Sequence, residues 1–213
     1  MDEAAARVWL VEELNVSRET MMRLTELVEL LKTENRTQNL VSELTLGTVW
    51  ARHIVDSAQL CRMAPDPLST WVDLGTGAGF PGLVVALCHG GAVTLVEERR
   101  KRADFLQRAV GLLGLRERVE LIAKRVETLS PRPFDVISAR AFAPLGRLLT
   151  LGARFAAPKT RWVLPKGRNA KSELAAVHAS WQGEFRLVPS VTDADGQIIV
   201  AEQVRPRPRK QKP

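Results

Sequence analysis

The sequence has no tyrosine and, among 213 residues, only two cysteines and three histidines. The absence of tyrosine excludes chemistry that needs a tyrosine acid or nucleophile. Two cysteines, Cys61 and Cys88, cannot build a four-ligand zinc site or a disulfide framework. The histidines do not have the spacing of a metal site either; they are His53, His89 and His178. We therefore expect no metal, and the low cysteine content is typical of the reducing cytosol.

Long hydrophobic runs are also missing. No apolar stretch approaches the roughly 20 residues that cross a membrane. The first residues, Met1 to Ala4, are acidic and lack the basic-then-apolar order of a signal peptide. These absences predict a cytoplasmic protein without a membrane partner.

Positive charge is concentrated at the C-terminal end. The chain has 31 Lys and Arg against 24 Asp and Glu, a net charge of +7. Residues 205–213 contain five of the basic residues and no acid, so the rest of the chain carries only +2. The excess suggests an anionic partner, and we expect residues 205–213 to form a disordered basic tail.

Residues 1–66 have the pattern of helices. Apolar residues recur at helical spacing from Leu24 to Leu31, and Ser17 is a suitable N-cap. A second helical stripe runs from Leu46 to Leu60, and a shorter helix is expected over Val8–Leu14. We interpret residues 1–66 as an N-terminal helical cap.

Residues 67–204 alternate between short apolar runs and helical segments. This alternation predicts an α/β domain with a mostly parallel, seven-stranded sheet and helices on both faces. The turn-rich stretch Ser190–Gly196 has no helical pattern, so the last two runs should form a hairpin with an antiparallel last strand. The expected strands are Trp71–Leu74, Val93–Val96, Val119–Ala123, Phe134–Ser138, Arg161–Leu164, Phe185–Val188 and Ile198–Val204, and the expected helices are Pro81–Cys88, Lys101–Leu113 and Leu145–Ala156, with a shorter segment near Glu127.

A glycine-rich stretch follows the first expected strand. Residues 73–82 read Asp-Leu-Gly-Thr-Gly-Ala-Gly-Phe-Pro-Gly, and a helix is expected to begin directly afterwards. Glycines permit left-handed backbone angles and close approach of a ligand. Glu97 ends the second expected strand, 20 residues beyond Gly77, where an acid can accept the two hydroxyls of an adenosine ribose. Strand, glycine turn, helix and acid together indicate a nucleotide-type site.

Asp73 favours one kind of ligand for this site. A carboxylate at the end of the strand should face the ligand, where it would repel the pyrophosphate of a dinucleotide. S-adenosylmethionine has no phosphate, and its ammonium and sulfonium groups are cationic. We therefore favour S-adenosylmethionine over a nicotinamide dinucleotide.

Several further segments match a known family. Arg-His-Ile-Val-Asp-Ser at residues 52–57 and Arg-Ala-Phe-Ala-Pro-Leu at residues 140–145 are the most specific of them. With these segments the chain resembles the bacterial 16S ribosomal RNA guanine-N7 methyltransferases, also called the glucose-inhibited division protein B family, over roughly residues 20 to 205. The other matching segments are Asn39–Ser42, the glycine stretch 73–82, Arg99–Leu106 and Lys166–Gly167.

The resemblance implies a fold and a cofactor site. The fold would be the Rossmann-like class I fold of S-adenosylmethionine-dependent methyltransferases with an N-terminal helical extension. In that family pattern Glu97 would hold the ribose, Val126 and Glu127 would flank the adenine, and Arg140 would lie at the pocket mouth. The expected cofactor-binding residues are Asp73, Gly75, Gly77, Gly79, Phe80, Glu97, Val126, Glu127 and Arg140.

The implied partner is 16S ribosomal RNA or a small-subunit assembly particle, bound by a monomeric enzyme. By the resemblance, Arg36, Arg52, His53, Arg140 and Lys166 would contact the RNA. The basic run Arg99–Arg102 opens a helix, where positive charge is unfavourable. This run is therefore either a phosphate contact or a solvated face.

Guanine N7 carries a free lone pair at neutral pH, so its methylation needs no general base. We accordingly expect no catalytic acid or base, and positioning becomes the main contribution of the protein. Arg140 or Lys166 should hold O6, a phosphate or the backbone, because a donor on N7 would occupy the attacking lone pair. A nicotinamide-dependent oxidoreductase and a non-catalytic RNA-binding or ribosome-assembly module remain the alternatives.

Overall fold

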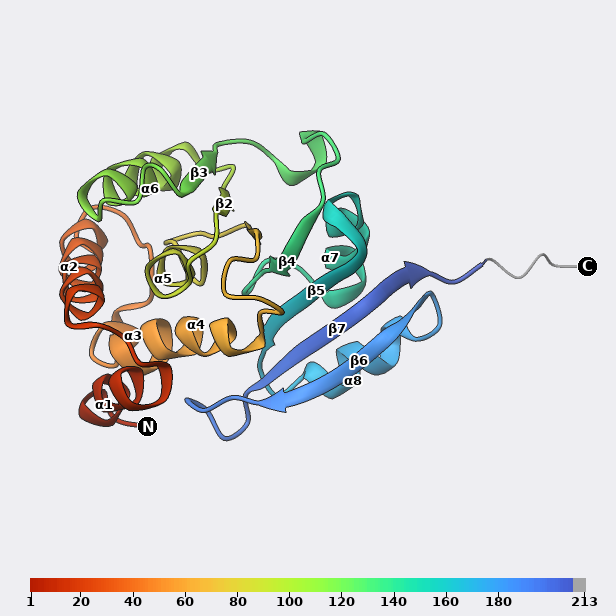
Figure 1. Cartoon of the computed structure of the whole chain (residues 1–213), viewed down its shortest axis with the longest axis horizontal. Coiled ribbons are helices and arrows are strands. Elements are labelled where there is room, and N and C mark those ends of the chain that lie inside the picture. Colours follow the sequence, from red (N-terminus) through yellow and green to blue (C-terminus); the bar gives the residue numbers. More distant parts are fainter. Residues whose placement is uncertain (209–213) are drawn as a thin grey trace, which may run out of the picture.

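The structure is a computed structural model that describes residues 1–208 (Figure 1). The chain begins with a series of helices, two of which have side-chain N-caps. Asp2 accepts from the Ala5 N–H at 2.8 Å, and Ser17 accepts from the Thr20 N–H at 3.1 Å. The helical elements of this part are α1 (Glu3–Leu14), α2 (Arg18–Asn35), α3 (Glu43–Leu46), the π-helical η1 (Trp50–Val55), α4 (Asp56–Ala58) and the 3₁₀-helical η2 (Gln59–Met63).

The rest of the chain forms a seven-stranded sheet in the order β3-β2-β1-β4-β5-β7-β6. The strands from β3 to β5 are parallel, and β7 is antiparallel to both β5 and β6. The expected hairpin and antiparallel last strand are therefore confirmed. The strands are β1 (Trp71–Leu74), β2 (Val93–Val96), β3 (Val119–Ile122), β4 (Phe134–Ser138), β5 (Ala156–Lys166), β6 (Trp181–Pro189) and β7 (Gln197–Pro206).

Helices cover both faces of the sheet, because the strand side chains alternate between two apolar cores. Trp71 lies in the core shared with the N-terminal helices, whereas Val72 lies in the opposite core. The first core also contains α5 (Gly82–Cys88) and α6 (Arg100–Leu112). The second core packs against η3 (Val126–Thr128), α7 (Leu145–Gly152), η4 (Ala153–Phe155) and α8 (Ala170–Val177).

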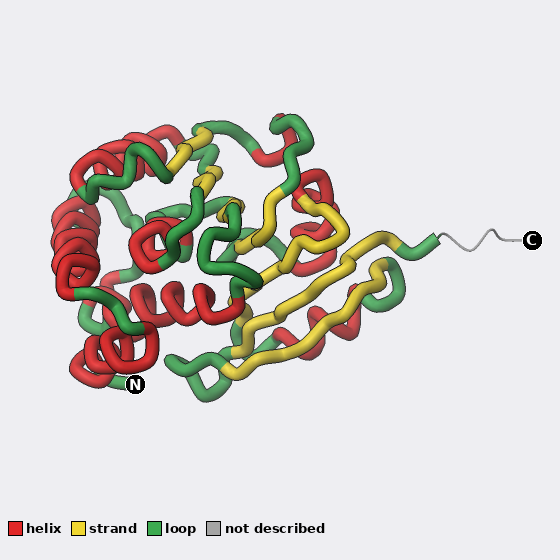
Figure 2. The backbone as a smooth tube through the Cα atoms, viewed as in Figure 1, coloured by secondary structure: helices red, strands yellow, loops and turns green. Residues whose placement is uncertain are grey.

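Several elements differ from the sequence-based expectations. The helix α7 ends at Gly152, β5 begins at Ala156 and β6 begins at Trp181, and the other helical elements differ further. The stripe from Leu46 to Leu60 is not one helix, because α3, η1, α4 and η2 follow one another with different helical pitch. The helix α8 was not expected, and α1 begins at Glu3, well before Val8. Figure 2 shows α8 as a separate helical segment beside the hairpin of β6 and β7.

The C-terminal end stays in the sheet longer than expected. The strand β7 continues to Pro206, and the Arg207 side chain donates to the His178 carbonyl at 2.8 Å. The expectation of a disordered tail from residue 205 is therefore wrong for these first residues. The remainder of that expectation, residues 209–213, lies outside the described residues.

Candidate active site

The glycine turn follows β1 and has left-handed backbone angles. Gly75, Gly77 and Gly79 have φ values of +67°, +62° and +91°. A Cβ on Gly75 would lie 2.2 Å from Cδ2 of Phe142. The space beside this glycine is thus filled by an aromatic ring from the segment between β4 and α7.

Two backbone N–H groups of the turn are already used by carboxylates. The Gly77 N–H donates to Glu97 Oε2 at 2.9 Å, and the Gly82 N–H donates to Asp73 Oδ2 at 3.0 Å. A pyrophosphate bound here would have to compete with two acidic side chains. The turn is therefore a poor site for a phosphate group.

The Asp73 side chain points into the protein interior, and its expected contact with the cofactor stays a prediction. The side chain is fully buried, and it also accepts from the Ser138 hydroxyl at 2.7 Å. Ser138 in turn accepts from the Trp71 indole at 2.8 Å. Burial raises the pKa of Asp73, while its hydrogen bonds oppose that rise. Asp73 therefore links the glycine turn to β4 through its hydrogen bonds with Gly82 and Ser138.

Glu97 lies at the end of β2 in the wall of a cavity of about 260 Å³. Its carboxylate accepts from the N–H groups of Gly77 and Arg99, both at 2.9 Å, and it is only 4% exposed. We call this space the donor cavity, after the cofactor site that the sequence predicts around Glu97. Besides Glu97 it is lined by Gly75, Val96, Glu98, Arg99, Arg102, Lys124, Arg125, Val126, Glu127, Ala141, Phe142, Ala143 and Arg147.

The expected cofactor residues separate into two groups. Gly75, Glu97, Val126 and Glu127 line the donor cavity. Glu127 is ionised more readily than usual: its own backbone N–H and then two arginines lower its pKa. Phe80 stacks on His53 with ring centroids 5.0 Å apart, away from the donor cavity. The expected residues that do not line the donor cavity are Asp73, Gly77, Gly79, Phe80 and Arg140.

A second, larger cavity of about 980 Å³ lies beside the first. We call it the RNA cavity, after the RNA-contacting residues that the sequence predicts for it. Of the five expected RNA-contacting residues, Arg52, His53, Arg140 and Lys166 line this space. Arg36 does not join them, because it lines a separate hollow of about 590 Å³ between α1, α2 and η1.

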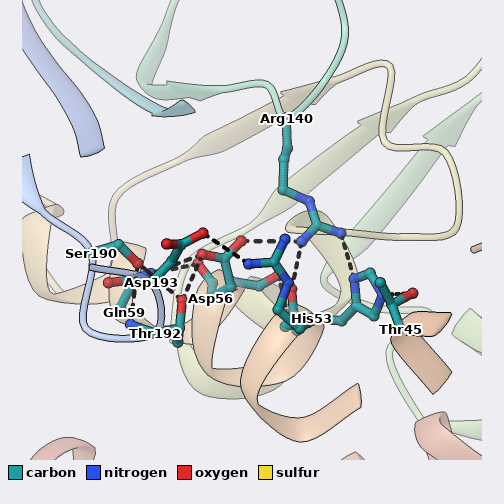
Figure 3. Close-up of polar contacts among 10 residues, drawn as sticks. Thr45, His53, Asp56, Gln59, Arg140, Ser190, Thr192 and Asp193 are labelled. Atoms are coloured by element: carbon teal, nitrogen blue, oxygen red, sulfur yellow. Dashed lines mark hydrogen bonds and ion pairs between the residues drawn. The ribbon is translucent and has the colours of Figure 1, made fainter. Parts of the chain in front are cut away.

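Arg140 is held by η1 and α4 (Figure 3). Its guanidinium donates to the Arg52 carbonyl and to Asp56 Oδ2, both at 3.1 Å, and to His53 Nδ1 at 3.0 Å. Because a guanidinium can only donate, His53 Nδ1 must accept, and its Nε2–H then donates to Thr45 at 3.0 Å. Burial, followed by the charges of Arg140 and Arg52, lowers the pKa of His53 to about 3. His53 is thus a neutral support for Arg140.

The turn between β6 and β7 closes the far side of the RNA cavity. Asp193 pairs with Arg52 at 2.9 Å, and Thr192 donates to Asp56 at 3.2 Å. Figure 3 shows Asp193, Thr192 and Asp56 together, beside Arg140 and His53. The hairpin is thereby fastened to the N-terminal helices across the cavity rim.

Lys166 fastens the other side of the cavity. Its ammonium group donates to the Ala143 carbonyl at 3.2 Å and to Glu173 at 2.9 Å. Glu173, on α8, also accepts from the Leu145 N–H at 2.7 Å, at the start of α7. Lys166 therefore supports the segment after β4, and a role in contacting RNA stays a prediction.

Sequence reasoning missed Phe142, Glu173 and Asp193 as contributors to this region. Phe142 lies inside the Arg-Ala-Phe-Ala motif, so its position was visible, but its contact with Gly75 joins two distant segments. Glu173 could have been found through α8, because Ala170 and Val177 fall on one apolar face. Asp193 had no local signal, since its role depends on how the hairpin packs.

In residues 1–208 no group of three or more His, Cys, Asp or Glu side chains could hold a metal ion. None of the helices in that part of the chain is both long and apolar enough to cross a membrane.

The sheet order with its antiparallel β7, the glycine turn after β1 and the acid after β2 are the features of the class I methyltransferase fold. The family model described as rRNA small subunit methyltransferase G, or GidB, matches residues 20–198. The chain belongs to this family.

Relatives of the same description match nearly the whole chain. A ribosomal RNA small subunit methyltransferase G of Rhizorhabdus wittichii is 54% identical over 215 residues, covering 100% of this chain and 98% of the relative. The protein of the same description from Zymomonas mobilis is 42% identical over 218 residues, covering 99% of this chain and 98% of the relative.

Solved structures share the fold at low sequence identity. An O-methyltransferase from Bacillus cereus in complex with SAH has a TM-score of 0.60 at 16% identity, covering 93% of this chain and 97% of that one. A mutant of MtNAS in complex with S-adenosylmethionine has a TM-score of 0.59 at 17% identity, covering 95% of this chain and 84% of that one.

Proposed function

We propose that this protein transfers a methyl group from S-adenosylmethionine to N7 of a guanine in 16S ribosomal RNA. Membership of the rRNA small subunit methyltransferase G family supports the reaction and the substrate. The observation that carries the proposal in the structure is a shared wall. Ala141, Phe142 and Ala143 line both the donor cavity and the RNA cavity. A donor in one cavity and a base in the other would meet at this wall.

The donor cavity has groups that fit the cofactor. Glu97 offers a buried carboxylate for the two ribose hydroxyls, and Val96 and Val126 offer apolar surface for the adenine. Gly75 and Glu127 complete the proposed site, while Gly77, Gly79 and the buried Asp73 and Phe80 shape the turn. When bound, S-adenosylmethionine supplies an electrophilic methyl group on a sulfonium.

On the acceptor side the proposed task is orientation. Guanine N7 attacks with its own lone pair, so none of the residues needs to remove a proton. Holding the two reactants in line can contribute about 7–11 kcal/mol. We assign Arg140 to O6 of guanine or to a phosphate, in line with its place in the RNA cavity and with the major-groove edge of the base.

The same proposal extends to partner and location. Arg52, His53 and Lys166 would contact the RNA, or support residues that do, and Arg36 would contact it from its separate hollow. The substrate would be an assembling small subunit or its RNA, bound by a monomer. Because bacterial ribosomes are assembled in the cytoplasm, the proposal places the enzyme there.

The two alternatives are not favoured. A nicotinamide-dependent oxidoreductase needs phosphate-binding N–H groups at the glycine turn, and the carboxylates of Glu97 and Asp73 already use two of them. A non-catalytic assembly module would have no use for a complete donor cavity.

The proposal is tested with the purified chain, unmethylated small ribosomal subunits and donor labelled on its methyl carbon. We expect label in 16S ribosomal RNA, released as 7-methylguanine after digestion. Label on ribose, on cytosine or on protein would reject the base assignment. Fluorescence quenching by NADH, with no response to S-adenosylmethionine, would instead favour the oxidoreductase.

A further inference from the structure

Phe142 is the aromatic side chain of the wall that separates the two cavities. Its ring lies against Gly75, and a Cβ on that glycine would approach three ring atoms within 2.2 to 3.1 Å. Gly75 therefore lacks a side chain partly to admit this ring. Both residues line the donor cavity, so a donor lying over the glycine turn would touch the Phe142 ring.

The backbone that carries Phe142 is fixed from the opposite side. Two residues earlier, Arg140 binds η1 and α4 through the Arg52 carbonyl and Asp56. One residue later, the Ala143 carbonyl accepts from Lys166. Arg140 and Lys166 line the RNA cavity and not the donor cavity, whereas Phe142 lines both.

The short link between anchors and ring is held in an uncommon conformation. Ala141 has a φ of +52°, in the left-handed region that residues with a Cβ rarely adopt. Such a conformation persists only where surrounding contacts enforce it. A ligand that presses on the ring, or one that binds Arg140, therefore acts on the same few residues.

We propose, on the basis of the function above, that Phe142 is a positioning residue that couples donor binding to RNA binding. Each ligand stabilises the arrangement of residues 140–143 that the other ligand contacts, so the two ligands bind with positive cooperativity. Because coupling of this kind is reciprocal, RNA strengthens donor binding by the same factor as donor strengthens RNA binding.

The test uses the full chain, unmethylated small ribosomal subunits and S-adenosylhomocysteine, which has no methyl group to transfer. Calorimetry gives its affinity without the subunits and with the subunits at saturation. For the wild type we expect about 5-fold or more tighter binding with the subunits present, at the lower end of typical coupling. The coupling ratio is the affinity for S-adenosylhomocysteine with the subunits divided by the affinity without them. For Phe142→Leu and Phe142→Ala this ratio should fall toward one, with each ligand still bound on its own.

Phe155→Leu is the matched control, because Phe155 is a buried aromatic residue that lines neither cavity. It should keep the wild-type ratio. A ratio that stays unchanged in both Phe142 variants, or a wild-type ratio of one, overturns the coupling and leaves the methyltransferase assignment intact. Loss of binding of both ligands by the wild type itself would instead reject the proposed function.

Discussion

At the scale of single residues, two carboxylates hold the backbone of the glycine turn. Asp73 and Glu97 both accept backbone N–H groups of the turn, but only Glu97 reaches a cavity. The sequence placed both acids at strand ends, and it could not distinguish them, because a side chain at a strand end can point up or down. The register of Asp73 with Ser138 decides this, and it comes from strand pairing.

Glu97→Gln tests the acid that reaches the cavity. The amide keeps the shape of the side chain and loses the charge that accepts hydroxyl groups. Since hydrogen bonds to charged groups contribute about 1.5–3 kcal/mol, donor affinity should fall roughly tenfold or more by calorimetry. Glu120→Gln is the control, because Glu120 is an exposed acid on β3 that pairs with Arg132. Equal donor affinity in wild type and Glu97→Gln would contradict the ribose role.

His53 makes a prediction about pH. Its pKa is lowered from 6.5 to about 3 in the folded protein, so the folded state holds it neutral while the unfolded state binds a proton below about pH 6.5. The contribution of neutral His53 to the free energy of unfolding is therefore complete above that pH. It is lost as the pH falls toward 3, by at most about 1.4 kcal/mol per pH unit.

Urea unfolding between pH 7.5 and 5 measures this contribution. The wild type should lose more stability on acidification than His53→Gln, in which the titrating ring is absent. Parallel pH curves for the two proteins would show that His53 does not titrate abnormally.

At the scale of elements, the regular parts of the fold were predictable and the connections were not. Strands such as β1 and β2 are short, mostly apolar runs that are buried on both faces, and their bounds match the expectation. The region from α3 to η2 could not be read in the same way. The spacing of apolar residues predicts a helix, but it does not predict where the helix changes from α to π or 3₁₀ pitch.

The helix α8 gives a prediction for Lys166, which the sequence suggested as an RNA contact. Lys166 and Glu173 pair at 2.9 Å, with side chains 11% and 28% exposed, and together they hold Ala143 and Leu145. Lys166→Met and Glu173→Gln should each lower the free energy of unfolding by about 1–2 kcal/mol. Urea unfolding checks this, and Glu173→Gln should also slow RNA methylation. If Lys166 served only RNA, Glu173→Gln would leave the methylation rate unchanged.

At the scale of the whole molecule, the candidate site is assembled from distant parts of the chain. The donor cavity comes from the parallel half of the sheet, as the motif predicts. The RNA cavity needs the N-terminal helices, the segment after β4 and the turn after β6, which meet only in the folded protein. Family motifs pointed to four of its residues, but the ion pair of Arg52 with Asp193 across its rim had no signature in the sequence.

Reductive cleavage of RNA tests the central claim most directly, because a guanine methylated at N7 becomes labile to borohydride and aniline. Unmethylated small subunits are incubated with the protein and S-adenosylmethionine, and their 16S RNA is then treated and mapped by primer extension. We predict one new, donor-dependent cleavage at a guanine. Methyl incorporation into the RNA without any such cleavage would contradict the account.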